Sequence, residues 1–588
     1  MHFEKYNLKL TTMKKFLLTL FAIFASMVSA GAYDFMVDGI YYDINEDGTT
    51  LAIVPDESYK DFTGDLVLPD TVTYNGTKYT VTSIKNEAFK NCNGLTSVTL
   101  SSTVTTVGMM AFDHCVNLET LNIGTSFNMW GSSPFSNCKN VKTVNWNARK
   151  IHPFSSYHAS PLLGYSNVTT FNVGPDVEEI PEALLYSFFS LNTINWNARN
   201  CANSPFATLR DDIKALVKTV NIGDSVRSIP HSFIAGMKNV EILSIGKSVT
   251  SIGDSAFIHC ANITSAVFNN NLKEIGGLAF AYCVRLSDVY IGDSVKSIGQ
   301  FAFGACHELR SIALPETLTE ISFQLFGYCA KLSKVNIPSN VTSIGAYAFD
   351  ECSSLSVIEI PETVSYIGRY AFSGTRMESF VVPELVTTIE SGTFSYNGHL
   401  KNISLHKNIT AIKDDAFSSC TGLIHFSLPV KVETIEHETF AYCESLESIS
   451  IPDGVTSIGW AAFSACWKLK NIYCYAATPP VVSDGSDCDL DAFWRDYYQY
   501  WYGDFSAFHG VNMQNCTVYV PKGSGESYRN ARYWGYFNIV EADMSGVDEI
   551  NCVKPADGPV QRYNVLGQPV GDNYHGIVIE NGKKILVP

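Results

Sequence analysis

Residues 280–306 read FAYCVRLSDVYIGDSVKSIGQFAFGAC, and they decide the fold because they hold one unit of a repeat and the start of the next. Phe280 is followed 23 residues later by Phe303, and Cys306 follows Phe303 at the spacing at which Cys283 follows Phe280. Apart from a long gap after the third, the steps are 23 residues, with one of 24 and one of 22. The members are Phe89, Phe112, Phe135, Phe233, Phe257, Phe280, Phe303, Phe326, Phe349, Phe372, Phe394, Phe417, Phe440 and Phe463. A fixed period of this length is typical of repeat architectures.

Each unit contains one short strand. The apolar residues six and eight positions after the cysteine, Val289 and Ile291 in the quoted unit, alternate as strand residues do. A proline often follows, as at Pro315 and Pro338, and ends the strand because proline cannot donate to a ladder. The remainder, for example residues 341–345, is too short for a full helix. We therefore expect one strand and a compact return per unit.

A single unit buries too little apolar surface to offset the entropy of ordering its residues. Stacked units give each other ladder hydrogen bonds and a second buried face. The period thus predicts one continuous, mainly β solenoid over residues 81–475. Between Phe135 and Phe233 the period blurs, but Trp146-Asn147-Ala148-Arg149 recurs at residues 196–199. A doubled unit with loop insertions is the simplest interpretation.

The run Leu-x-x-Val-x-Ile, closed by Ile-Gly-x-x-Ala-Phe-x-x-Cys, resembles the BspA-like leucine-rich repeats of bacterial surface proteins over about residues 80–475. The resemblance implies a mainly β leucine-rich repeat solenoid of 23-residue repeats with N- and C-terminal caps. It is less specific for function, because the family includes adhesins, host-protein binders and proteins without a known partner.

Both ends of the repeat array read as caps. Alternating apolar residues on either side of Asp47-Gly48 predict a β-hairpin, and residues 31–80 resemble the family's N-terminal β-hairpin cap. Residues 516–523 with Tyr528 and Trp534 resemble the closing module, so residues 476–545 are assigned to an aromatic-rich C-terminal cap. Caps cover sheet edges that would otherwise be exposed.

The N-terminus has the features of a secretory signal peptide over residues 1–30. Lys14 and Lys15 precede an apolar stretch from Phe16 to Val28 and the small residues Ser29-Ala30. Cleavage after Ala30 and cleavage after Ala32 are both compatible with this pattern, and Met13 is an alternative start. No membrane span is expected after cleavage. We predict a secreted or bacterial cell-surface protein.

Residues 546–588 are a linker followed by alternating apolar segments from about residue 562. This tail is similar to the C-terminal sorting domains of type IX secretion cargo, although it is shorter. The resemblance implies delivery to the bacterial surface. A small inert β-module is the alternative.

The net negative charge of the chain argues against nucleic acids as partners. The chain has 41 Lys and Arg against 58 Asp and Glu, a net charge of −17, and no long basic run. Nucleic-acid binding requires clustered positive charge. We therefore expect no nucleic-acid partner.

Eleven of the 16 cysteines occupy one repeat position, where Thr375 and Asn397 replace cysteine in two units. A small, buried, weakly polar side chain explains all three residue types, so we predict free structural thiols. A disulfide between Cys488 and Cys516 is the alternative. The repeat-position cysteines are Cys92, Cys115, Cys138, Cys260, Cys283, Cys306, Cys329, Cys352, Cys420, Cys443 and Cys466.

No metal or cofactor is predicted. Residues 43–48 copy the first half of a calcium loop, but Val54 stands where a bidentate glutamate is needed, which favours a hairpin turn. Asp487, Asp489 and Asp491 form either a weak calcium site or a solvated acidic loop. His437-Glu438 lacks the second histidine of a zinc protease helix.

Catalysis is not expected either. The chain contains neither a G-x-S-x-G nucleophile elbow nor a P-loop. A hydrolase would need a convergent pocket that linear sequence does not show. We therefore predict a protein that is not an enzyme.

Two surfaces are candidates for binding. The residues beside the core positions of each strand, such as Thr120 and Asn122, are small and polar, which suits extended contact with a protein or glycan and equally suits solubility. Residues 490–509 contain nine aromatic side chains, which predict either a ligand-binding site or a plug for the end of the core. The tentative ligand-binding residues are Trp494, Tyr497, Tyr498, Tyr500, Trp501 and Tyr502.

These features predict a non-catalytic, adhesin-like binding protein that presents an extended solenoid surface to host or bacterial proteins. The alternative is a glycan-binding accessory protein that uses residues 490–509. The ligand is in either case an extracellular protein or glycan.

Overall fold

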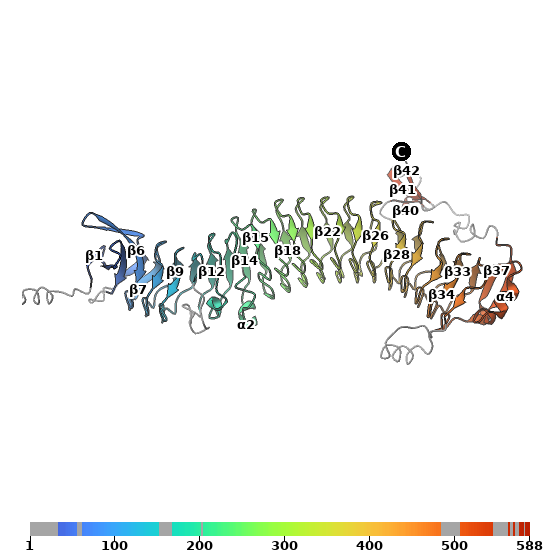
Figure 1. Ribbon diagram of the computed structural model, residues 1–588, viewed down its shortest axis with the longest axis horizontal. Coiled ribbons are helices and arrows are strands. Elements are labelled where there is room, and N and C mark those ends of the chain that lie inside the picture. The colour runs from blue at the N-terminus through green and yellow to red at the C-terminus, as the bar shows by residue number, and fades with distance from the viewer. Residues whose placement is uncertain are drawn as a thin grey trace, which may run out of the picture. The chain divides into compact units, whose positions relative to one another are not determined.

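The structure is a computed structural model that describes residues 33–55, 62–151, 167–201, 204–483 and 506–544, and the backbone of four strands between residues 562 and 587. The predicted signal peptide lies outside the described residues. The chain divides into two compact units, Met1–Pro230 and His231–Pro588. This boundary falls inside the range 81–475 assigned to one solenoid, and both units are built from stacked coils (Figure 1).

The first sheet of the N-terminal unit begins with the predicted hairpin. Ile44 pairs with Leu51 in antiparallel register across the turn at Asp47-Gly48. The Asp47 carboxylate accepts hydrogen bonds from the Thr50 hydroxyl at 2.6 Å and from the Thr49 and Thr50 N–H groups, and these bonds lower its pKa to about 2. The calcium-loop-like sequence is therefore a hairpin turn.

The strands of this sheet are β1 (Phe35–Val37), β2 (Ile40–Ile44), β3 (Thr50–Val54), β5 (Thr71–Tyr74), β6 (Thr77–Ile84), β8 (Thr106–Val107) and β10 (Met129–Trp130). Their order is β1-β2-β3-β6-β8-β10, with β5 antiparallel to β6.

The second sheet of this unit is parallel and contains the coils in which the period blurs. Its strands, in spatial order, are β4 (Thr63–Val67), β7 (Gly94–Thr99), β9 (Thr120–Ile123), β11 (Thr143–Trp146), β12 (Thr170–Val173), β13 (Thr193–Trp196) and β14 (Thr219–Ile222). The last five pair threonine to threonine, in steps of 23, 27, 23 and 26 residues. The predicted doubled unit with insertions is confirmed, and its extra residues lie outside the strands.

The other elements of the N-terminal unit are short. They are the 3-10 helix η2 (Glu182–Leu185), the helix α2 (Asp211–Lys214) and β15 (Ser228–Ile229).

All coils but one in the described part of the C-terminal unit have a longer strand, and most have a two-residue strand as well. The longer strands are β16 (Ile242–Ser244), β18 (Ser265–Val267), β20 (Asp288–Tyr290), β22 (Ser311–Ala313), β24 (Lys334–Asn336), β27 (Ser379–Val381), β29 (Asn402–Ser404), β31 (His425–Ser427), β33 (Ser448–Ile451), β35 (Asn471–Cys474), β37 (Thr517–Pro521) and β38 (Asn538–Ala542). One coil is the exception, because residues 357–359 stand at the longer-strand position without forming a strand.

The two-residue strands are β17 (Ser251–Ile252), β19 (Glu274–Ile275), β21 (Ser297–Ile298), β23 (Glu320–Ile321), β25 (Ser343–Ile344), β26 (Tyr366–Ile367), β28 (Thr388–Ile389), β30 (Ala411–Ile412), β32 (Thr434–Ile435), β34 (Ser457–Ile458) and β36 (Val481–Val482). The closing region adds η3 (Met513–Asn515), α4 (Gly525–Asn530) and η4 (Trp534–Tyr536). The C-terminal tail forms an antiparallel sheet of β39 (Arg562–Asn564), β40 (Pro569–Val570), β41 (Gly576–Glu580) and β42 (Lys583–Val587).

The glycine of the recurring Ile-Gly pair is explained by close contact between coils. A Cβ on Gly345 would lie 2.7 Å from the backbone nitrogen of Phe323 and 2.8 Å from the carbonyl carbon of Ser322 in the preceding coil. Both atoms belong to the backbone and cannot move aside. Only glycine fits this position without separating the coils.

The core of the C-terminal unit is a column of phenylalanine rings. From Phe257 to Phe463 every ring of the predicted series is 0% exposed. Successive rings lie 4.8 to 6.2 Å apart between centroids, within 22° of parallel. The predicted single buried column is confirmed for this unit.

Phe233 is not the first member of that column. Ile234 occupies the position, because its N–H donates to Ala256 O as the N–H of Phe257 donates to Ala279 O one coil later. Cys260 Sγ likewise donates to Ile234 O. The step of 24 residues in the sequence is therefore a regular step of 23 in which isoleucine replaces phenylalanine.

The repeat-position cysteines bond to the coil before them. In the ten from Cys115 to Cys466, Sγ donates to the carbonyl oxygen of the column residue 26 positions earlier, at 3.0 to 3.3 Å. Asn397 does the same with Nδ2, which donates to Phe372 O at 2.8 Å, and Thr375 donates its hydroxyl to Asn397 Oδ1. The cysteines are free and buried, as predicted. Cys516 is also free and buried, whereas Cys488 lies outside the described residues.

The ring column generates a stability prediction. Phe303→Ala is expected to lower the free energy of unfolding by about 3–5 kcal/mol, because it removes a fully buried ring from between Phe280 and Phe326. Denaturant titration measures the loss, and hydrogen exchange should place it in the neighbouring coils. Ser311→Ala, on an exposed strand position, is the control and should change stability by less than about 0.5 kcal/mol.

The thiols generate a second prediction. Burial raises the pKa of Cys283, Cys329 and Cys443 to about 12, so these groups are thiols rather than thiolates at neutral pH. The repeat-position cysteines of the folded protein should not react with a thiol reagent at pH 8, and all of them should react in denaturant. Rapid labelling of these positions in the native protein, located by mass spectrometry, would contradict the structure.

Candidate functional site

The six aromatic residues predicted from sequence lie outside the described residues, since residues 484–505 are not described. The described residues after them close the core. Phe508 stacks on Phe463 at 5.3 Å and contacts Trp534 edge to face at 5.7 Å. Trp534 is fully buried and donates its indole N–H to Pro480 O at 2.8 Å. Trp534 and Phe508 thus cover the last ring of the phenylalanine column.

One candidate surface is the outer face of the parallel sheet in the N-terminal unit. Its strands β9, β11, β12, β13 and β14 have the pattern Thr-x-Asn-x, in which the second and fourth residues are buried and the threonine and asparagine are half-buried. Registers align all five threonines and all five asparagines. We call this surface the Thr/Asn face; its residues are Thr120, Asn122, Thr143, Asn145, Thr170, Asn172, Thr193, Asn195, Thr219 and Asn221.

The asparagines of the Thr/Asn face form a hydrogen-bonded ladder. Asn195 Nδ2 donates to Asn172 Oδ1 at 2.6 Å, and Asn221 Nδ2 donates to Asn195 Oδ1 at 2.7 Å. The same bond joins Asn172 to Asn145 and Asn145 to Asn122. The ladder fixes the side-chain rotamers, so contact with a partner costs little further side-chain entropy. The result is a rigid surface of amides and hydroxyls without charge.

Thr120 and Asn122 are predicted from sequence as outward-facing residues, whereas the ladder that Asn122 belongs to is not. The signal was present as five recurrences of Thr-x-Asn-x at strand positions. It was hidden because two of the steps between strands are 27 and 26 residues, and only the register shows that the strands remain aligned.

The outer strand face of the C-terminal unit is less regular. It carries exposed apolar residues, Val267 and Val381 among them, between charged ones such as Asp288 and Lys334. Towards its end Tyr473 stacks on Tyr519 at 4.9 Å.

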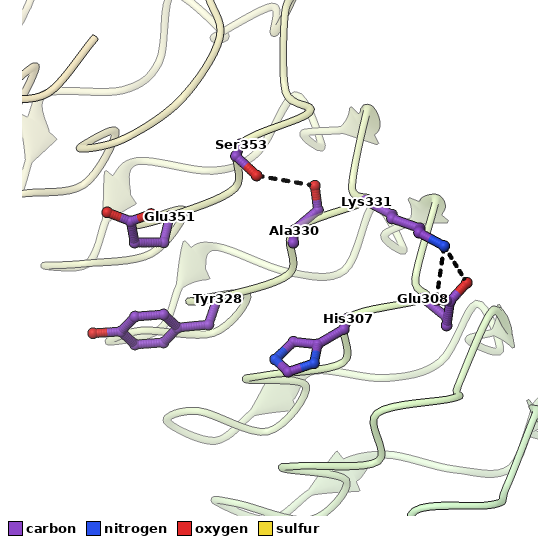
Figure 2. A pocket seen from close by; sticks show the side chains of 7 residues that line it. All are labelled: His307, Glu308, Tyr328, Ala330, Lys331, Glu351 and Ser353. Carbon is purple, nitrogen blue, oxygen red and sulfur yellow. Dashed lines mark hydrogen bonds and ion pairs between the residues drawn. The ribbon is translucent and has the colours of Figure 1, made fainter.

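The second candidate surface is a depression of about 360 Å³ in the C-terminal unit (Figure 2). It lies on the edge formed by the turns around the column phenylalanines, which we call the turn edge. Three successive coils contribute to it, from turns that follow Phe303, Phe326 and Phe349. We call it the Tyr328 pocket; its lining residues are His307, Glu308, Tyr328, Ala330, Lys331, Glu351 and Ser353.

Backbone geometry positions the two projecting residues of the Tyr328 pocket. Tyr328 and Glu351 both occupy the left-handed region, with φ of 63° and 56°, and each stands two residues after a column phenylalanine. Tyr328 N–H donates to Asp350 O at 2.7 Å, and Glu351 N–H donates to Ser373 O at 2.9 Å. Coil-to-coil bonds therefore hold a conformation that is unfavourable for residues with a Cβ.

A pair of half-buried carboxyl groups lies elsewhere in the turns of the C-terminal unit. Asp415 and Glu438 occupy equivalent positions in adjacent coils, with φ of 57° and 51°, and they hydrogen-bond to each other. Tyr370 donates its hydroxyl to Asp415 Oδ2 at 3.3 Å. Burial, and then the neighbouring negative charge, raise the pKa of Glu438 to about 8, and burial raises the pKa of Asp415. At neutral pH the pair holds one shared proton.

The groups around this carboxyl pair also connect neighbouring coils. Asp414 Oδ1 accepts a hydrogen bond from His437 N–H at 3.1 Å, and the His437 ring stacks on Trp460 at 5.0 Å. The Tyr328 pocket is lined by other residues, none of them from this cluster. The pair is a hydrogen bond between neighbouring coils.

No metal centre is found within the described ranges, where no three His, Cys, Asp or Glu side chains gather in a way that could hold an ion. Among the same residues, no helix has the length and apolar character that a membrane span requires.

The carboxyl pair predicts how stability depends on pH. A carboxyl group whose pKa is raised on folding contributes stability at low pH, and that contribution is lost as the pH rises from the unfolded value near 4.5 through about 8. Glu438→Gln, which stays neutral, should raise the free energy of unfolding at pH 9 by roughly 1–3 kcal/mol and change it little at pH 4. Thermal melts across this range measure the difference.

Glu447→Gln is the matched control for that variant. It removes one partner of the exposed ion pair with Lys470, 3.2 Å apart, and should lower stability by less than about 1 kcal/mol at every pH above 5. An equal gain at pH 4 and pH 9 in Glu438→Gln would show that the carboxyl pair does not titrate as described.

Comparisons with solved structures found several bacterial leucine-rich repeat proteins. A leucine-rich repeat protein from Bacteroides ovatus is 23% identical, covers 75% of this chain and 94% of its own, and has a TM-score of 0.35. A leucine rich cell surface protein from Faecalibacterium prausnitzii has the same identity and coverage, with a TM-score of 0.24. The pneumococcal vaccine antigen PcpA is 12% identical, covers 87% of this chain and 98% of its own, and has a TM-score of 0.27. No curated protein matches the chain.

A family model describes the repeats directly. The model for the BspA type leucine rich repeat region matches in six copies, over residues 72–192, 213–296, 273–401 and 366–479, which is more than half of the chain. This match confirms both the predicted resemblance and the mainly β leucine-rich repeat solenoid. The coils, their ring column and this match together establish that the chain belongs to the BspA-type leucine-rich repeat family.

Proposed function

We propose that this protein is a non-catalytic, adhesin-like protein of the bacterial surface or its surroundings, which binds an extracellular protein through the Thr/Asn face. The family match supports a repeat-based binding surface. The predicted signal peptide over residues 1–30 supports export. The tail, which is similar to a type IX sorting domain, supports delivery to the cell surface.

The observation that carries the proposal is the asparagine ladder. Each side-chain amide offers both a donor and an acceptor, and the neighbouring threonine hydroxyls add further groups of both kinds. Backbone amides and polar side chains of a protein partner match such a surface. Because the bonds between Asn122, Asn145, Asn172, Asn195 and Asn221 already order these side chains, the face is preorganised for contact.

Charge distinguishes this face from an electrostatic binding site. Its threonine and asparagine positions carry no formal charge, and the nearby Lys142 is paired with Glu119 at 2.7 Å. Binding through this surface should therefore depend only weakly on ionic strength.

The test uses the mature chain, residues 31–588, against a panel of extracellular-matrix proteins and a glycan array. Thr170→Lys with Thr193→Lys places two charges on the half-buried Thr/Asn face and should weaken protein capture at least about tenfold, which corresponds to 1.4 kcal/mol. Ser311→Lys, on an exposed strand position of the C-terminal unit, is the control and should bind as the unmodified chain does.

Melting curves of the double variant test whether it is folded. Unchanged capture by the folded double variant, or capture of glycans and no protein, would overturn the proposal.

A glycan-binding accessory role through residues 490–509 is the second candidate, with Trp494, Tyr497, Tyr498, Tyr500, Trp501 and Tyr502 as its residues. Nine aromatic side chains among these twenty residues favour it. Phe508, one of the nine, covers the end of the ring column together with Trp534, which leaves the other eight aromatic side chains available for a ligand.

A further inference from the structure

We propose that the Tyr328 pocket is a carbohydrate-binding site that takes one neutral pyranose residue of a glycan. The site is separate from the Thr/Asn face and from residues 490–509. It lies on the turn edge of the C-terminal unit, where three coils contribute side chains (Figure 2).

Tyr328 provides the platform for the sugar ring. Its side chain is 45% exposed although its backbone is held by the bond to Asp350 O. The Tyr328 side chain lines the pocket. An amphipathic aromatic surface is suited to stacking against the apolar face of a pyranose.

Tyr282, at the equivalent position two coils earlier, shows the contrast. Its ring stacks on His259 at 4.6 Å and meets Phe301 edge to face at 5.5 Å, so neighbouring rings of the protein occupy its surface. Among the described residues, Tyr328 stacks on no aromatic ring, and its surface is available to a ligand.

Polar side chains line the pocket together with Tyr328. Lys331 Nζ lies 2.7 and 2.8 Å from the two carboxylate oxygens of Glu308, and Ser353 donates its hydroxyl to Ala330 O at 3.3 Å. His307 and Glu351 complete the rim. Sugar hydroxyls both donate and accept, and this rim offers carboxylate acceptors together with ammonium and hydroxyl donors.

The charges of the rim select a neutral ligand. Glu308 and Glu351 repel phosphate and carboxylate groups, whereas Lys331, already paired with Glu308, repels cations such as a lysine side chain. The Glu308 carboxyl has a lowered pKa because Lys331 hydrogen-bonds to it, so it stays ionised and serves as an acceptor. An uncharged ligand rich in hydroxyl groups can hydrogen-bond to the polar side chains of the rim without leaving a charge unpaired.

The experiment titrates the full mature chain with glucose, galactose, mannose and N-acetylglucosamine, each as free sugar and as a tetrasaccharide, by calorimetry and saturation-transfer NMR. At least one sugar should bind, and Tyr328→Ala should weaken it at least about tenfold. Tyr328→Phe keeps the ring and should stay within about threefold. Lys331→Met should weaken binding by about three- to tenfold, because it removes a donor and leaves Glu308 unpaired.

Tyr396→Ala is the matched control. Tyr396 is 63% exposed and stands at the equivalent left-handed position, with φ of 57°, but it does not line the pocket. Its variant should bind sugar as the unmodified chain does. Equal losses in Tyr328→Ala and Tyr396→Ala would overturn the assignment to this pocket.

Two further variants separate this site from the others. Thr170→Lys with Thr193→Lys should leave sugar binding intact, so the outcome is independent of the Thr/Asn face. Trp494→Ala with Trp501→Ala should also leave it intact, and loss of binding there would overturn the proposal. Binding of none of the sugars, or binding of a tetralysine peptide that Tyr328→Ala abolishes, would overturn it as well.

Discussion

The packing of each phenylalanine ring of the C-terminal unit between the rings of the coils before and after it is the constraint on which that unit depends. A ring at the Phe303 position has Phe280 on one side and Phe326 on the other, and both contacts exist only if the coils are stacked in register. A single coil would leave both faces of its ring in water. The same register that closes the core also aligns every outward position into columns.

Backbone and side-chain bonds between coils reinforce that register. The buried cysteine of each coil donates to the carbonyl of the previous column residue, and the Ile-Gly pair lets the backbones approach without an intervening Cβ. Asn397 shows that the requirement is for a compact donor rather than for sulfur, because its amide reaches Phe372 O and Phe394 O together. A repeat position can therefore change residue type while its physical role is retained.

The inward-facing positions can be predicted well from sequence, because each has the same physical role in every coil. Phe257 to Phe463, the free thiols and the hairpin at Asp47-Gly48 all follow from local chemistry or from the period. Phe233 was placed wrongly because composition alone cannot show that Ile234 is the residue whose carbonyl accepts the next cysteine. The period locates a column position in the sequence only where a single residue can occupy it, and Phe233 and Ile234 are both candidates for the same position.

The candidate sites were harder to predict because they combine residues that are distant in sequence. Asn172 and Asn195 meet only because β12 and β13 are in register, and the extra residues between other strands obscured the pattern. Lys331 and Ser353 come from neighbouring coils and line the Tyr328 pocket without any shared motif. The candidate residues between 494 and 502 were instead chosen because aromatic side chains are concentrated in that stretch of sequence. They lie outside the described residues.

The turn edge shows how one structural requirement yields different surfaces. Each turn places a residue in the left-handed region two positions after the column residue, and the ladder of bonds between coils holds it there whatever its side chain. At Ala305 and Ser419 this residue is small, at Tyr282 its ring packs on other rings, and at Tyr328 its ring remains exposed beside charged groups. Since the backbone bears the conformational cost in every coil, the side chain at this position is free to vary without loss of the fold. Binding specificity in such a chain resides in the residues that the stacking does not constrain.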